Sequence, residues 1–503
     1  MKHAMNILIC LLLMLALALP VSAVGNAVEV TDADLVTDHS GFASLNRLFD
    51  TYEITPVAFE NGASLTLHCP DGIGSLYLIF DLEYGPFTVT DPDTGKAATF
   101  GEHRFLHEFA DLEEVFGYPP VRVTVTFGSG AGALNELRVF TPGTVPESVQ
   151  IWETPRDGET DIVLFSTHGD DEQLFFAGLL PYYAAERDVQ VQVVYLTDHR
   201  NLTNVRCHEM LNGLWAVGVR SYPVFGSYPD LLTQSANQTR LLFQGRGIAE
   251  EEVLGFVVEQ LRRFHPLVAV GHDLQGEYGH GQHMFYADLL TRAVQISNDP
   301  TQFPESAEAY GVWDVPKTYL HLYPENEIVM DWDIPLASFN GMTAFQVTRQ
   351  LGYPCHETQY WDFAWYLSYA DSAASIRNYS PCEYGLYRST VGPDINKNDF
   401  LENLQTHAQR IAEEEAARLA AEEEARRLEE ARLEAERLQE EERLRQEEIQ
   451  RQQEQERLEL QQEAAAQEQL RRRILTMWSL AGVLTVLRLL GAAVALLDRR
   501  KNI

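Results

Sequence analysis

Residues 404–470 contain neither Gly nor Pro, and this constrains the fold of the chain more than any other feature. Glu, Arg, Gln, Ala and Leu, which favour helices, dominate the segment, and Glu precedes Arg by four residues at five places, the order that stabilises a helix. Its main apolar residues step by five and six positions and so form no single seam: Leu433, Leu438, Leu444 and Ile449. We expect one charged helix of about 100 Å. The alternative is a coiled coil that self-associates through 404–470.

Apolar segments lie near both ends of the chain. Ile7–Leu19 follows a basic start and precedes a small-residue cleavage site, so residues 1–23 are interpreted as a cleaved signal peptide rather than a retained anchor. Residues 474–497 carry one charge, Arg488, and are long enough to cross a bilayer; an interfacial helix is the alternative. A cleaved signal peptide followed by a late membrane-spanning segment predicts a single-pass cell-membrane protein whose catalytic part is extracytoplasmic.

Charge and cysteine content narrow the range of partners. The formal net charge is −36, of which residues 411–470, with 20 Glu and 9 Arg, contribute −11 and leave −25 for the rest. Because an acidic surface repels phosphate backbones, we expect no nucleic-acid partner. Five cysteines occur without a Cys-x-x-Cys pair, which excludes a cysteine-built zinc site. Cys355 and Cys382 either form a disulfide or stay free, and Cys207 is expected to be a buried thiol.

Two globular modules precede the charged helix. Residues 24–150 contain short alternating segments separated by Gly- and Pro-rich turns, which predicts a β-sandwich. Its closing segment, 134–143, resembles that of discoidin-like, galactose-binding-type jelly rolls. The module is therefore interpreted either as carbohydrate-binding or as a spacer packed on its neighbour. Residues 157–395 alternate apolar strands with helices, which predicts a Rossmann-like α/β domain with a parallel sheet. Its expected helices are 172–187, 203–217, 250–264 and 284–294.

A histidine and two aspartates follow the first strand of the α/β domain, in the sequence His168-Gly169-Asp170-Asp171-Glu172. Zinc takes imidazole and carboxylate ligands, and a catalytic zinc needs three of them. Adjacent aspartates do not face one metal in the same way, so we expect one to bind it and the other to hold or deprotonate water. The plain alternative is that one of them only caps the following helix.

A second polar cluster, residues 272–283, also lies between an apolar strand and a helix. It contains three histidines, together with glycines that allow a tight loop to approach a ligand: His272, His280 and His283. Because His280 and His283 are three residues apart, one can bind metal while the other faces substrate. Ligands of α/β sheets bind beyond the carboxyl ends of the strands. The two clusters therefore predict one joint metal site.

Together the clusters resemble the PIG-L/LmbE-like family of zinc-dependent de-N-acetylases over residues 157–395, on His168-x-Asp170-Asp171-Glu172 and Gly276-Glu-Tyr-Gly-His280-x-x-His283. The resemblance implies zinc, or another divalent metal, held by three side chains: His168, Asp171 and His283. It implies that Asp170 is the general base that activates water. It also implies that His280 stabilises the oxyanion or protonates the leaving amine. Substrate contacts are assigned to Arg206, Asp230, His272 and Tyr278.

The chain departs from the family at Gly169, where the family usually has Pro. Gly keeps the chemical side chains but loosens the turn that carries them, and a displacement of about 1 Å lowers catalytic rates. Asp198 and His199 end a strand on the expected active face, where His199 is interpreted as a loop residue. We predict an active zinc-dependent hydrolase that removes N-acetyl groups from an amino sugar such as a GlcNAc-type glycan. The alternatives are a degenerate glycan-binding or adhesion protein on the same fold, and a zinc hydrolase of another amide or ester.

Overall fold

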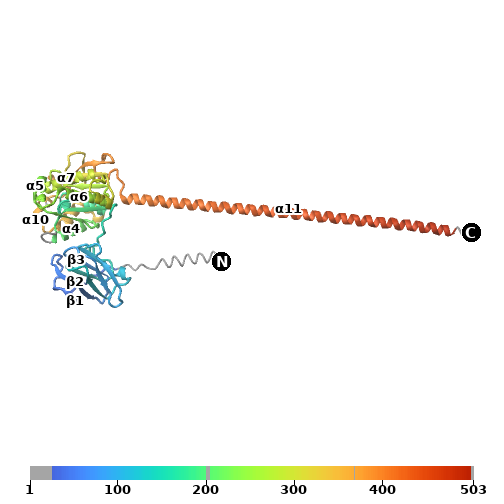
Figure 1. Cartoon of the computed structure of the whole chain (residues 1–503), viewed down its shortest axis with the longest axis horizontal. Coiled ribbons are helices and arrows are strands. Elements are labelled where there is room, and N and C mark those ends of the chain that lie inside the picture. The colour runs from blue at the N-terminus through green and yellow to red at the C-terminus, as the bar shows by residue number, and fades with distance from the viewer. Residues whose placement is uncertain (1–24, 200–203, 368, 500–503) are drawn as a thin grey trace. The chain divides into compact units, whose positions relative to one another are not determined.

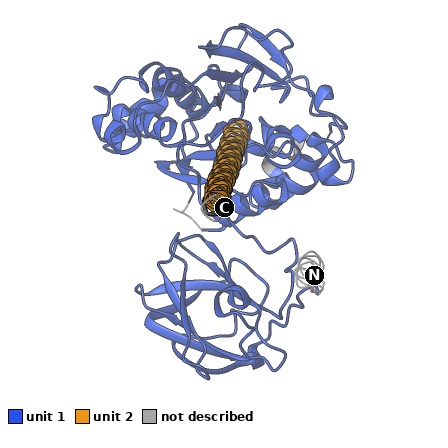
Figure 2. Cartoon of the chain, turned by 90° about the vertical axis from the view of Figure 1, so that its right-hand side faces the viewer, with its two compact units in different colours: residues 1–410 blue, residues 411–503 orange. Residues whose placement is uncertain are grey.

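The computed structural model describes residues 25–199, 204–367 and 369–499 (Figure 1). The predicted signal peptide, 1–23, lies outside the described residues. The chain divides into two compact units, residues 1–410 and 411–503 (Figure 2). Both predicted globular modules belong to the first unit.

The N-terminal module is an eight-stranded antiparallel sheet in the order β5-β4-β7-β2-β8-β3-β6, with β1 added to β2. Its strands are β1 (Val36–Phe42), β2 (Val57–His68), β3 (Ser75–Phe80), β4 (Phe87–Thr90), β5 (Ala97–Phe100), β6 (His107–Asp111), β7 (Arg122–Phe127) and β8 (Gly132–Phe140), with a short helix α2 (Leu112–Phe116). Strand β2 pairs with β8 at its start and with β7 at its end, so it belongs to both halves of the sheet. Gly62, with a φ of +81°, lies between these two pairings. One hydrophobic core contains residues of both halves.

The second module contains a seven-stranded sheet in the order β11-β10-β9-β12-β13-β15-β14. Its strands are β9 (Ile162–Ser166), β10 (Val191–Asp198), β11 (Val224–Pro229), β12 (Val268–Gly271), β13 (Lys317–His321), β14 (Glu327–Val329) and β15 (Glu383–Ser389). The first five strands are parallel, as predicted, but β15 is antiparallel to β13 and β14 is antiparallel to β15.

Helices cover both faces of this sheet, because alternate residues of β9 belong to two different hydrophobic cores. The helices are α3 (Asp171–Leu174), α4 (Val205–Ala216), α5 (Ala236–Gly245), α6 (Glu250–Phe264), α7 (Gly281–Ile296), α8 (Pro304–Tyr310), α9 (Ala344–Val347) and α10 (Tyr360–Leu367). The helix expected over 172–187 is wrong as one element, since α3 ends at Leu174 and a separate π-helical turn begins at Pro181. Gly178 lies between them at a φ of +95°, and a Cβ there would lie 2.5 Å from Trp332.

The two modules of the first unit pack directly on each other. The ring of Phe105 stacks on Tyr222 with centroids 4.2 Å apart, and the Leu106 N–H donates to the Tyr222 hydroxyl at 3.0 Å. His107 Nε2 lies 2.8 Å from His208 Nδ1 in the same buried interface. These contacts agree with the second interpretation of the N-terminal module, a domain packed on its neighbour.

Four cysteines of the described residues are free thiols: Cys69, Cys207, Cys355 and Cys382. No disulfide therefore joins Cys355 to Cys382 in the described part of the chain. The Cys355 thiol instead faces the Leu351 carbonyl, and Cys382 is buried just before β15. Cys207 is buried within α4, as predicted.

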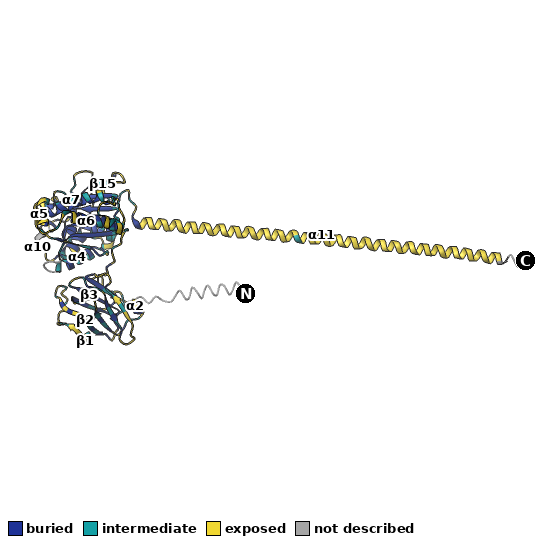
Figure 3. Ribbon diagram, in the orientation of Figure 1, coloured by how far each residue is buried: buried dark blue, intermediate teal, exposed yellow. Residues whose placement is uncertain are grey.

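The charged and the apolar C-terminal segments form one continuous helix, α11 (His407–Arg499), of 93 residues. Thr406 Oγ1 accepts the Gln409 N–H, and Gln409 Oε1 accepts the Thr406 N–H, which closes the start of the helix. Ion pairs between Arg and Glu three or four residues apart recur along it. Its surface is almost entirely exposed (Figure 3). By length and composition the apolar part could cross a membrane.

Candidate metal centre

The three predicted metal ligands meet at the carboxyl end of the parallel sheet. His168 follows β9, Asp171 opens α3, and His283 lies in the first turn of α7. His168 Nδ1 lies 3.1 Å from both Asp171 Oδ2 and His283 Nε2, and His283 Nε2 lies 3.3 Å from Asp171 Oδ2. Ligand atoms of a tetrahedral zinc with bonds of about 2.0–2.1 Å lie about 3.3–3.4 Å apart. The spacing of the three atoms therefore fits a metal held by three protein ligands.

Gln282 fixes the orientation of the His168 ring. Its Oε1 lies 3.2 Å from His168 Nε2 and also accepts the Leu231 N–H at 2.6 Å, while its Nε2 donates to the Pro229 carbonyl at 2.9 Å. Because Gln282 Oε1 is an acceptor, the hydrogen of His168 lies on Nε2 and the lone pair of Nδ1 faces Asp171. Apart from the position of Gln282 next to His283, nothing in the sequence indicates this role.

Glu277 accepts hydrogen bonds from three imidazoles next to the site. It is a second residue whose role the sequence does not indicate. Its Oε2 accepts from Nδ1 of His272 and His283, at 2.9 and 2.6 Å, and its Oε1 accepts from His321 Nδ1 at 2.6 Å. Burial raises the pKa of Glu277, but the charges and hydrogen bonds of His272 and His283 outweigh it and hold the pKa well below its usual range. The carboxylate thus leaves the lone pair of His283 Nε2 facing the ligand triangle.

His272 is buried next to the predicted ligands and does not face open space. It is 1% exposed, its Nε2 accepts the Thr167 N–H at 3.1 Å, and its Nδ1 faces Glu277. Both ring nitrogens are therefore engaged by protein groups, and the position differs from the substrate contact assigned to it. Its Nε2 also lies 3.4 Å from Asp171 Oδ2.

Asp170 occupies the N-cap position of α3 without acting as a cap. Among the described residues, its side chain makes no hydrogen bond to the first amides of the helix. It is 4% exposed, and its Oδ1 lies 3.8 Å from Arg206 Nη2. Burial and the charge of Asp171 raise the pKa of Asp170 to about 6, against the opposing charge of Arg206. The plain capping alternative does not account for this carboxylate, whereas a proton acceptor beside the metal site does.

His280 is the other residue with an assigned catalytic role. Its Nδ1 accepts the Gln282 N–H at 3.3 Å at the start of α7, and its ring centroid lies 4.8 Å from that of His168. Burial and the neighbouring imidazoles of His168 and His283 lower the pKa of His280 to about 2. The ring is therefore neutral, and with Nδ1 accepting, its hydrogen lies on Nε2. This arrangement favours donation to an oxyanion over protonation of a leaving group.

The remaining assigned residues surround the ligands. Arg206 donates to the Gly169 carbonyl at 3.0 Å and pairs with Glu209 at 3.2 Å. The side chain of Asp230 is 51% exposed, and its Oδ1 lies 3.5 Å from His168 Nε2. The Tyr278 ring lies 5.5 Å from that of His280, on a backbone with a φ of +46°. All three positions adjoin the site, and their contacts with substrate stay predictions.

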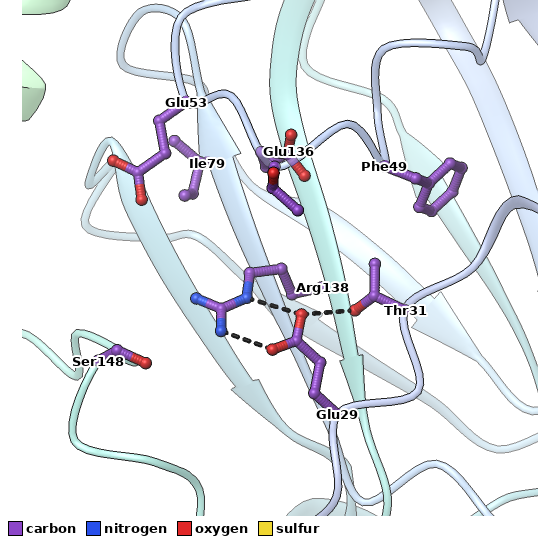
Figure 4. A pocket seen from close by; sticks show the side chains of 9 residues that line it. Glu29, Thr31, Phe49, Glu53, Ile79, Glu136, Arg138 and Ser148 are labelled. Carbon is purple, nitrogen blue, oxygen red and sulfur yellow. Dashed lines mark hydrogen bonds and ion pairs between the residues drawn. The ribbon is translucent and has the colours of Figure 1, made fainter.

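A separate cavity of about 590 Å³ lies in the N-terminal module (Figure 4). Arg138 and Glu29 form a bidentate ion pair on its wall, with distances of 3.0 and 2.7 Å. The cavity is lined by Glu29, Thr31, Phe49, Thr51, Glu53, Ile79, Glu136, Arg138 and Ser148. Its mixture of carboxylates, hydroxyls and one aromatic ring marks the place in this module where the predicted carbohydrate binding is to be tested.

Residues 163–294 match the model of the PIG-L family, described as GlcNAc-PI de-N-acetylase. This stretch contains the three residues of the triangle, His168, Asp171 and His283. Among curated relatives, the 1D-myo-inositol 2-acetamido-2-deoxy-alpha-D-glucopyranoside deacetylase 1 of Catenulispora acidiphila is 28% identical over 187 residues, covering 33% of this chain and 56% of the relative. The corresponding deacetylase of Mycobacterium leprae is 29% identical over 196 residues, covering 34% and 61%.

Among solved structures, the N,N'-diacetylchitobiose deacetylase from Pyrococcus horikoshii aligns with a TM-score of 0.30 and 15% identity, covering 45% of this chain and 82% of that one. The chain spans somewhat more than half the length of the curated relatives it matches.

Proposed function

We propose that this protein is a metal-dependent hydrolase that removes the N-acetyl group from an N-acetylated amino sugar of the GlcNAc type. The observation that carries the proposal is the triangle of His168 Nδ1, Asp171 Oδ2 and His283 Nε2, with the uncapped carboxylate of Asp170 beside it. The substrate class is supported by the curated relatives, whose names describe deacetylation of a 2-acetamido-2-deoxyglucopyranoside linked to inositol.

Each side chain of the site has a distinct task in this proposal. His168, Asp171 and His283 would hold the metal, for which zinc is the first choice, given two imidazoles and one carboxylate. A zinc ion held by these residues would supply Lewis-acid chemistry, making the carbonyl more electrophilic and water more acidic. Asp170 takes the proton of the attacking water, and His280 donates its Nε2 hydrogen to the oxygen that becomes negatively charged. The proton held by Asp170 then passes to the amide nitrogen as the C–N bond breaks, which yields acetate and the free amine.

The decisive experiment is to measure acetate release by the full chain from a panel of N-acetylated glycans, before and after metal removal and zinc addition. We expect activity only with metal bound, and loss of both stoichiometric zinc and activity in His283→Ala. His68→Ala, in the N-terminal module, is the matched control and is expected to keep both. A degenerate glycan-binding or adhesion protein would purify without stoichiometric metal and release no acetate. Turnover of His283→Ala equal to that of the unmodified chain would refute the assignment of the metal site.

The proposal includes an extracytoplasmic location with one membrane span in the apolar part of α11. The support is the sequence order of an N-terminal apolar segment and the late apolar segment 474–497. The charged segment 404–470 would then act as a spacer between the membrane and the catalytic domain. Deletion of 474–503 should move the protein from the membrane fraction to the soluble fraction. Protease added to intact cells should cleave within 404–470, and protection of that segment would contradict the orientation.

Carbohydrate binding by residues 24–150 is a separate prediction, and its proposed place is the cavity between Glu29 and Glu53 (Figure 4). Replacement of Glu53 by Gln should weaken binding of N-acetylated oligosaccharides to the full chain if the cavity is used. Unchanged binding would leave the module with a packing role only.

A further inference from the structure

The peptide groups of Gly169 are held by side chains from two other elements. The Gly169 N–H donates to His199 Nε2 at 3.0 Å, and the Gly169 carbonyl accepts from Arg206 Nη2 at 3.0 Å. His199 follows β10, and Arg206 lies in the first turn of α4. A proline at position 169 would have no N–H, so the hydrogen bond to His199 depends on the absence of the family's proline at this position.

Met210 occupies the space where a side chain at position 169 would lie. A Cβ built on Gly169 would be 2.2 Å from Met210 Sδ and 2.6 Å from Met210 Cγ, and Met210 is fully buried. Arg206 and Met210 are four residues apart on α4, so one face of the helix contacts the Gly169 turn with both side chains. The turn is thus enclosed by packing on one side and by hydrogen bonds at both peptide groups.

His199 directly follows the end of β10, and its side chain is largely buried. Its side chain is 5% exposed. Thr197 Oγ1 lies 2.8 Å from His199 Nε2 and 2.8 Å from the Thr167 carbonyl oxygen, so these contacts join the ends of β10 and β9. Because Nε2 accepts the Gly169 N–H, the hydrogen of the ring lies on Nδ1, which is 3.8 Å from Asp230 Oδ2. His199 thus lies outside the regular elements, as predicted, but its side chain is buried and hydrogen-bonded.

We infer that His199 is a positioning residue that holds the Gly169 turn, and with it Asp170 and Asp171, in place of the ring constraint that proline supplies in the family. Glycine is the least constrained residue, so the direction of the two following carboxylates depends on contacts from outside the turn. Asp171 must keep its Oδ2 within 3.1–3.3 Å of the two imidazole nitrogens. The inference rests on the proposed metal site and predicts that loss of the His199 acceptor weakens metal binding as well as turnover.

The test compares His199→Gln with His199→Leu in the full chain. Gln places an amide oxygen near the position of Nε2 and can accept the Gly169 N–H, whereas Leu has similar bulk and no acceptor. For Leu we expect a zinc Kd about 10–100-fold higher and a kcat lower by up to about 100-fold, with KM changed little. The His199→Gln variant should keep a zinc Kd and a kcat close to those of the unmodified chain. Zinc affinity is measured by chelator competition, which needs no substrate, so failure of the proposed deacetylation and failure of this inference are distinguished.

A second set of variants covers the case in which His199→Leu does not fold. In a chain with His199→Ala and Met210→Ala, the added change Gly169→Pro supplies the ring constraint in the space that Met210 has vacated. We expect this triple variant to recover zinc affinity relative to the double variant, with Met210→Ala alone as the control for lost packing. The inference is overturned if His199→Leu binds zinc as tightly as the unmodified chain, or if proline gives no recovery in the triple variant.

Discussion

Replacement of Glu277 by Gln tests whether the carboxylate beneath the metal site sets its affinity. Glu277 is fully buried, so water does not take over its hydrogen bonds. Its Oε2 accepts from His272 and His283, and its Oε1 accepts from His321. Gln has the same shape but only one acceptor oxygen, so whichever way the amide turns, its NH₂ group faces at least one imidazole N–H.

The contacts decide which orientation the amide takes and how much it costs. Hydrogen bonds to a charged group contribute about 1.5–3 kcal/mol each. An amide oxygen on the Oε2 side loses the bond to His321, about 1.5–3 kcal/mol, and the longer one from the Asp273 N–H at 3.3 Å, whereas the reverse loses the two short bonds to His272 and His283, about 3–6 kcal/mol. The first orientation is favoured, so His283 keeps its partner but loses the negative charge behind its ring. Changes of this kind weaken metal binding about 10–100-fold, equivalent to about 1.4–2.8 kcal/mol.

We therefore expect Glu277→Gln to fold, with a lower unfolding temperature and a zinc Kd higher by about 10–100-fold in chelator competition. The matched control is Asp394→Asn, a buried carboxylate at the opposite end of β13 that accepts from Tyr319 at 2.5 Å and pairs with Lys317. This control should also lower the unfolding temperature but leave the zinc Kd unchanged. The reasoning is refuted if Glu277→Gln binds zinc as tightly as the unmodified chain, or if the control weakens zinc binding equally.

Three other substitutions test separate parts of the structure. Asp170→Asn should keep zinc but lower kcat about 10²–10⁴-fold in steady-state kinetics, because the proton acceptor is lost; near-normal turnover would contradict that role. Gln282→Leu should raise the zinc Kd about 10-fold in chelator competition by freeing the His168 ring, and an unchanged Kd would show that His168 needs no such partner. Burial, with the neighbouring Asp50, raises the pKa of Glu136 to about 8 from 4.5, so its contribution to stability is present below pH 4.5 and lost as the pH rises through 8. Glu136→Gln should therefore raise the unfolding temperature at pH 9 by the equivalent of about 1–3 kcal/mol but hardly at pH 5; equal shifts at both would contradict this.

The parts of the site that the sequence could predict are those whose position follows from strand ends. His168 and Asp171 come directly after a buried apolar strand, and His283 opens the helix after another. In a parallel sheet these ends meet at one edge, so local sequence was enough to bring the three side chains together. The bounds of α4 and α6 were also close to the expected ranges 203–217 and 250–264.

The parts that could not be predicted depend on contacts between residues far apart in the sequence. Glu277 gains its importance from His321, 44 residues later, and nothing near either residue indicates the pairing. The break after Leu174 depends on Trp332, which fills the space beside Gly178. Hydrophobic periodicity and secondary-structure propensity describe one segment of the chain at a time. They therefore carry no information about a neighbouring residue that belongs to another helix or strand.

The outer hydrogen bonds of the two metal-binding histidines bear on the choice between a hydrolase and a degenerate binding protein. Gln282 places the hydrogen of His168 on Nε2, and Glu277 places the hydrogen of His283 on Nδ1. With these tautomers, assigned from the hydrogen-bond partners, two lone pairs and the carboxylate of Asp171 face one another at 3.1–3.3 Å. Three acceptors so close together repel one another unless a cation lies among them. A protein that only held glycans would need neither this arrangement nor the two buried residues that enforce it, so the geometry favours a working metal site.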